Sequence, residues 1–102
     1  MKPGRVRIEV PSERIAEFCR RNHIRRLAFF GSVLRDDFRP ESDVDVLVEF
    51  EPGTRLGFAF FGIEQELSQI LGRRVDLRTP QELSKYFRDE VLAEAEDVYV
   101  AA

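Results

Sequence analysis

One short segment, DVDVLVEF from Asp43 to Phe50, constrains the fold more than any other part of the chain. Its valines favour a buried strand, whereas aspartate is depleted in strands and an unpaired buried carboxylate costs several kcal/mol. Because side chains alternate along a strand, Asp43 and Asp45 point to one face and the valines between and after them to the other. The segment therefore predicts a strand with one apolar face and two converging carboxylates on the opposite face.

Helical and extended segments alternate along the rest of the chain. The helices are predicted from the 3.6-residue spacing of apolar side chains and from capping signals. They run from a cap at Ser12 through Cys19 to residues 22–23, from Leu56 to Leu71 with Gly72 as a left-handed cap, and from a capping box of Thr79, Pro80 and Glu82 through Leu83, Tyr86, Phe87 and Val91. Short apolar runs predict strands at Arg25 to Gly31, Asp43 to Phe50, Arg73 to Thr79 and Val98 to Val100.

This order of elements, helix, strand, strand, helix, strand, helix, strand, indicates the α/β (α+β) class, with a small mixed β-sheet and helices packed against it. The link between Phe30 and Asp43 is too short for a parallel crossover, so the first two strands are expected to be antiparallel neighbours. The length of 102 residues predicts a single domain over residues 1–102.

Composition narrows the possible functions. The formal charge of -3 and the pI of about 5.2 argue against direct nucleic-acid binding, which is normally accompanied by a basic surface. No apolar run approaches the ~18 residues that a membrane helix needs, so no membrane contact is expected. The single Cys19 cannot form an internal disulfide and no apolar stretch follows the basic start of the chain, which favours the cytoplasm.

The two carboxylates suggest a divalent cation. Two acids that face each other repel unless a cation lies between them, and Mg2+ is commonly held by one or two carboxylates together with substrate phosphates. Asp76 repeats the anomaly, because it is an acid between Val75 and Leu77 in a predicted strand. If that strand lies beside the first with Asp76 on the same face, three acids can bridge two metal ions ~3.5 to 4 Å apart, which suits an in-line phosphoryl or nucleotidyl displacement.

A glycine and a serine follow the first predicted strand. Gly31 lacks a Cβ and lets a ligand approach the backbone, and Ser32 is expected to cap a short helical turn that ends at Arg35. Backbone N–H groups at such a turn attract phosphate, and the guanidinium of Arg35 would add a fixed positive charge.

Together these motifs resemble the nucleotidyltransferase superfamily of DNA polymerase beta, and in particular its minimal nucleotidyltransferase (MNT) branch, the antitoxins of HEPN-domain toxins. The residues that carry the resemblance are Gly31, Ser32, Arg35, Ser42, Asp43, Asp45 and Asp76. The resemblance implies that the three aspartates bind Mg2+ and catalyse, and that the glycine, the two serines and the arginine bind the nucleotide. It also implies that AMP is transferred from ATP to a tyrosine hydroxyl of a HEPN toxin, which silences its RNase activity.

The resemblance leaves several points open. The family's GSxARG turn is GSVLRD here, and the acidic Asp36 leaves open whether the site is active. The base preference, the acceptor residue, the number of transfers and the composition of a homo- or hetero-oligomer are also open. Because larger relatives carry a further domain beside the nucleotide, a partner is expected to complete the pocket here.

Two other functions compete with this one. The chain could neutralise a toxin by binding alone, with the acids structural, or it could add nucleotides to RNA through an arginine cluster, for which a solvated helix end is the simpler explanation. That cluster consists of Arg20, Arg21, Arg25 and Arg26. The segment GFAFFG from Gly57 to Gly62 is either core or an exposed partner surface, and Ser42 either orients Asp43 or closes the turn before it.

Overall fold

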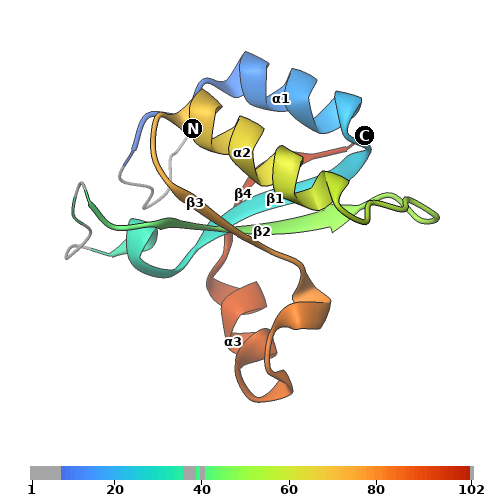
Figure 1. Ribbon diagram of the computed structural model, residues 1–102. Coiled ribbons are helices and arrows are strands. Elements are labelled where there is room, and N and C mark those ends of the chain that lie inside the picture. Colours follow the sequence, from blue (N-terminus) through green and yellow to red (C-terminus); the bar gives the residue numbers. More distant parts are fainter. Residues whose placement is uncertain (1–7, 36–38, 40, 102) are drawn as a thin grey trace.

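The computed structural model describes residues 8–35, 39 and 41–101. Its elements follow the predicted order, with two 3-10 turns added (Figure 1). They are α1 (Ser12–Arg21), β1 (Ile24–Phe30), η1 (Gly31–Leu34), β2 (Val44–Phe50), α2 (Ala59–Leu71), β3 (Val75–Arg78), η2 (Pro80–Glu82), α3 (Lys85–Glu94) and β4 (Glu96–Val100).

The four strands form one mixed sheet in the order β3-β2-β1-β4. β1 pairs antiparallel with β2, as the short link between them predicted, and β4 pairs antiparallel with the other side of β1. β3 runs parallel to β2, and α2 provides the crossover between them. β4 therefore lies at one edge of the sheet, as expected, and β3 at the other.

Helices cover both faces of the sheet. α1 and α2 lie on one face, whereas α3 lies on the other (Figure 1). The valines of β2 pack under α1 and α2 with Phe18 and Phe29, and all are fully buried. Leu47 points to the other face and forms a second, smaller core with Ala28, Leu83 and Val91. The predicted alternation of β2 is therefore confirmed.

The starts of three elements differ from the prediction. Ser12 is the first helical residue of α1, and the cap position is occupied by Pro11, which makes no side-chain capping bond. Ser32 lies inside the 3-10 turn, because Gly31, at φ +76°, turns the chain directly after the strand. Gly57 has a φ of +52°, outside the helical region, so α2 begins after it rather than at Leu56. Gly72 is the left-handed cap that was predicted, with φ +68°.

The predicted third helix is divided in two. Glu82 Oε1 accepts a hydrogen bond from the Thr79 N–H at 2.8 Å, as expected in a capping box, but this box opens only the turn η2. Leu83 is extended and buried in the second core, and Ser84 Oγ then caps α3 by accepting from the Tyr86 N–H at 3.2 Å. A second cap five residues after the first therefore starts the helix afresh.

Two open alternatives are also decided by packing. In GFAFFG, Phe60 packs edge-on against Phe50 with ring centroids 6.3 Å apart, whereas the side chains of Phe58 and Phe61 are 100% and 67% exposed, so the segment is part core and part surface. Three of the four clustered arginines contact carboxylates, which agrees with a solvated, ion-paired face. The pairs are Arg21 with Glu66, Arg25 with Glu49, and Arg26 with both Glu49 and Asp97. Within the described ranges, the helices are too short or too polar to cross a membrane.

Candidate active site

The three aspartates meet at one end of the sheet. Asp43 directly precedes β2, and Asp45 lies within it. On the neighbouring strand Asp76 is the residue in register with Asp45. Residues in register point to the same face, and the neighbours Val75 and Leu77 are buried toward the opposite one. The predicted placement of Asp76 beside Asp45 on the same face is therefore confirmed.

Asp45 has a carboxyl group whose pKa is raised by this arrangement. Its half-buried position raises the pKa of its carboxyl, the carboxylates of Asp76 and then Asp43 raise that pKa further, and the guanidinium groups of Arg78 and Arg35 offset part of the effect. Negative charge is thus concentrated where a cation would relieve the repulsion.

The other two carboxylates are held by arginines that the sequence analysis did not assign to the site. Arg78 Nε and Nη2 donate to the two carboxylate oxygens of Asp76 at 3.0 and 3.2 Å, and Arg74 Nη1 lies 3.5 Å from Asp43 Oδ1. Both arginines lie two residues from Asp76. Strand alternation alone would have placed all three side chains on one face, so the signal was present in the sequence.

The oxygen donors suit Mg2+ in their chemistry, because hard cations prefer carboxylate ligands. In the described part of the chain, no three acidic, histidine or cysteine side chains are gathered closely enough to grip a metal ion as they stand. Two of the three acids face guanidinium groups instead. A cation at Asp76 would compete with Arg78, which bonds both carboxylate oxygens, and a cation at Asp43 would compete with Arg74 for one oxygen.

Gly31 forms the wall beside Asp45. A Cβ at this position would collide with Asp45 Oδ2 and lie 3.2 Å from its Cγ, and the φ of +76° is one that other residues rarely adopt. The backbone conformation therefore favours glycine, and any side chain at this position would force the Asp45 carboxylate to move. The carboxylate of Asp45 occupies the room that the missing side chain leaves.

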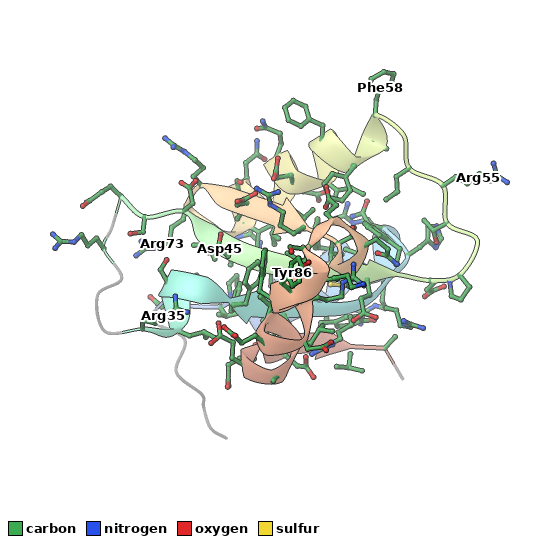
Figure 2. All side chains as sticks on the ribbon, turned by 90° about the horizontal axis from the view of Figure 1, so that it is seen from below. Arg35, Asp45, Arg55, Phe58, Arg73 and Tyr86 are labelled. Carbon is green, nitrogen blue, oxygen red and sulfur yellow. The ribbon has the colours of Figure 1, made fainter. Side chains whose placement is uncertain are left out.

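The remaining predicted residues lie in the turns that follow β1 and precede β2. The Ser32 carbonyl accepts from the Arg35 N–H at 2.9 Å, and Arg35 Nη2 reaches Glu94 Oε1 of α3 at 3.5 Å. Arg35 and Asp45 lie on neighbouring elements at the same end of the sheet (Figure 2). Ser42 Oγ accepts from the Arg39 N–H at 3.2 Å, which closes the turn before β2, so the turn-closing alternative holds. Asp36, the acidic residue that left the activity of the site open, lies outside the described residues.

Comparison with known proteins agrees with this geometry. Residues 12–98 match the family model of the nucleotidyltransferase domain. The chain is 38% identical over 84 residues to the protein adenylyltransferase MntA of Thermococcus cleftensis, which covers 82% of each chain. It is 36% identical over 75 residues to a Methanocaldococcus jannaschii protein assigned as a protein adenylyltransferase, covering 74% of this chain and 80% of that one.

Solved structures share the fold. A protein assigned as a minimal nucleotidyltransferase aligns with a TM-score of 0.69 and 37% identity, over 82% of this chain and 85% of that one. A chain of a toxin-antitoxin complex with AMP-PNP aligns with a TM-score of 0.71 at 21% identity, over 90% and 75% of the two chains. A chain from the complex of a tri-AMPylated Shewanella oneidensis HEPN toxin with its MNT antitoxin gives 0.63 at 22%, over 88% and 70%.

Proposed function

The chain belongs to the nucleotidyltransferase domain family, and we propose that it is an antitoxin that transfers AMP from ATP to a tyrosine hydroxyl of a HEPN-domain toxin. The family and the class of enzyme, a nucleotidyltransferase, are as the sequence predicted. The more specific acceptor and partner are supported by relatives named as protein adenylyltransferases and by similar folds solved with HEPN toxins.

The observation that carries the proposal is the register of Asp45 with Asp76 beside Asp43, against the wall formed by Gly31. Three acids converge here on the end of a sheet at the expense of charge repulsion. A structural role gives no reason to accumulate negative charge at one place, whereas a site for a cation and a triphosphate does.

In the proposed reaction the acceptor oxygen attacks the α-phosphorus of ATP. A bond forms between that oxygen and phosphorus, the bond from phosphorus to the bridging oxygen breaks, and pyrophosphate leaves. Asp76 would take part in accepting the hydroxyl proton, while Gly31, Ser32, Ser42 and Arg35 would hold the triphosphate. Two Mg2+ ions, held by the three aspartates, would supply neutralisation of the charge on the phosphates.

The partner is proposed from the surface as well as from the relatives. Phe58 and Phe61 expose apolar side chains at the start of α2, and large exposed apolar residues favour a protein interface. Phe58 projects outward at the opposite end of the molecule from Arg35 and Asp45 (Figure 2). In a hetero-oligomer, the partner would therefore have to cover Phe58 and Phe61 and also reach the site.

We propose the cytoplasm as the compartment and residues 1–102 as one domain.

The proposal is tested with a HEPN-domain protein that co-purifies with the chain. We expect mass spectrometry to detect adenylyl groups on its tyrosines after incubation with Mg2+ and ATP, and none with the Asp45→Asn variant. Transfer at the parental rate by that variant, or transfer without a divalent cation, would contradict the assignment of the site.

A second candidate is neutralisation by binding alone. The exposed Phe58 and Phe61 favour it, because a binding surface does not depend on the acids. Calorimetry separates the two functions. A module that only binds should show no Mg2+-dependent affinity for ATP and should inhibit the toxin equally well when ATP is absent.

A further inference from the structure

The edge strand β3 is tied to α2 by two side chains. Glu64 Oε2 accepts a hydrogen bond from the Leu77 N–H at 2.8 Å, and Ser68 Oγ accepts one from the Val75 N–H at 3.1 Å. The Ser68 hydroxyl donates its own hydrogen to the Glu64 carbonyl oxygen at 3.0 Å, which leaves a lone pair directed to the Val75 amide. These two amides therefore bond to a helix, where a further strand would otherwise pair.

The two bonds match in spacing. Glu64 and Ser68 are four residues apart, a rise of about 6 Å along a helix, and residues 75 and 77 of a strand are about 6.6 Å apart. The order is reversed between the partners, since Ser68 bonds the earlier amide and Glu64 the later one. A helix antiparallel to the strand can therefore make both bonds at once, and both hold the same three-residue segment of β3.

Asp76 is the central residue of that segment. Pairing with Asp45 holds its strand on the side of β2, and the two α2 bonds hold the amides before and after it on the free side. Val75 and Leu77 are also buried. The direction of the Asp76 side chain is thus determined from both edges of β3.

We propose that Glu64 and Ser68 are positioning residues for the nucleotidyl transfer, which hold β3 so that Asp76 stays beside Asp45. This inference rests on the proposed function, because it takes Asp76 to act in the transfer. Glu64 acts here as a hydrogen-bond acceptor and not through its charge. Glutamine, whose side-chain oxygen also accepts, should therefore replace it.

The test compares Glu64→Ala, Glu64→Gln and Ser68→Ala, with Gln65→Ala as the control on an exposed neighbour of α2. Transfer to the co-purified HEPN-domain protein is measured at a temperature where circular dichroism shows each variant folded. We expect kcat of Glu64→Ala and Ser68→Ala to fall by about 10- to 100-fold, the range typical for removing a group that orients a metal ligand, with the KM for ATP little changed. Glu64→Gln and Gln65→Ala should keep the parental kcat.

Hydrogen exchange provides a readout that needs no partner. The amides of Val75 and Leu77 should exchange faster in the alanine variants and at the parental rate in Glu64→Gln. If Glu64→Ala does not fold, Ser68→Ala and Glu64→Gln decide the question. A glutamine variant as impaired as the alanine variant would show a role for the charge and overturn the proposal.

The two levels of inference fail differently. A parental chain that transfers no AMP overturns the proposed function and with it the role in transfer. A parental chain that transfers AMP, together with an equally active Glu64→Ala, overturns the positioning role alone. The positioning role is also overturned if Glu64→Ala keeps the parental kcat and only self-associates through the uncovered edge of β3.

Discussion

Substitution of Gly31 by alanine adds a single methyl group beside the site, and we expect it to lower the stability of the chain more than a methyl group added elsewhere near the site. Two costs act together. The φ of +76° costs an L-residue ~1 to 2 kcal/mol. The new Cβ would also collide with Asp45 Oδ2, which can turn aside at the end of its side chain, but it would still lie 3.2 and 3.3 Å from Cγ and Cβ of Asp45, and overpacking costs ~1 to 3 kcal/mol. The sum, roughly 2 to 5 kcal/mol, is a large part of the ~5 to 15 kcal/mol by which a domain is stable.

Two other glycines provide matched controls. Gly53 has a φ of +84° but no atom within 4 Å of a built Cβ, so Gly53→Ala should pay only the conformational cost. Gly62 lies in α2, also with no atom within 4 Å, and Gly62→Ala should stabilise the chain by ~0.5 to 1 kcal/mol through its helix propensity. The excess loss in Gly31→Ala over Gly53→Ala then measures the collision with Asp45.

Urea unfolding followed by circular dichroism gives the three free energies, and transfer of AMP gives the effect on activity. Activity of folded Gly31→Ala should fall by about 100-fold if the collision displaces Asp45 by ~1 Å. The excess loss should shrink in an Asp45→Ala background, which removes the two carboxylate atoms nearest the new methyl group. Equal losses in Gly31→Ala and Gly53→Ala would refute the steric argument.

Three further predictions follow from burial. The pKa of Asp45 is raised in the folded chain, so ionisation of its carboxyl destabilises the fold. This loss of stability is absent below the unfolded pKa and develops as pH rises through the folded pKa. Without divalent cations, Asp45→Asn should thus unfold at higher urea than the parent at neutral pH, and a gap that widened on acidification would contradict this. Burial raises the pKa of Cys19 to about 12, so a thiol reagent at pH 8 should label it only after unfolding, and rapid labelling of the folded chain would show that the thiol is accessible. Finally, Phe60→Ala should lower the unfolding free energy by ~3 kcal/mol or somewhat less, since Phe60 is only partly buried. Phe61→Ala should leave the unfolding free energy nearly unchanged but weaken partner binding. Equal losses of unfolding free energy in the two variants would mean that both rings are packed.

The sheet and its acids could be predicted because they depend on short-range patterns. The period of two in Asp43 to Phe50 defined both faces of β2, and the lone acid between Val75 and Leu77 indicated the neighbouring strand. The sequence brought Asp76 to the other two acids only through the assumption that its strand lies beside Asp43 to Phe50 with Asp76 on the same face, and the structure agrees; the parallel direction and the pairing of Asp45 with Asp76 come from the structure alone.

The features that were missed depend on competition between local signals or on long-range contacts. Thr79 and Ser84 are both good caps, and only the burial of Leu83 shows that the second one starts α3. Predicting the contacts of Arg74 and Arg78 required knowing which side chains of β3 face the site, although both arginines lie two residues from Asp76 in the sequence. The bonds from Glu64 and Ser68 could not be found from sequence, since each is an ordinary polar residue until α2 is laid along β3.

The alternation of β2 has a consequence for how this chain can change over time. Val44, Val46 and Val48 fill the larger core, while Asp45 lies between them on the other face. Inserting or deleting one residue at the start of this strand would send carboxylates into the interior and valines to the face of the proposed site. Within β2, folding and chemistry are therefore inherited as one unit.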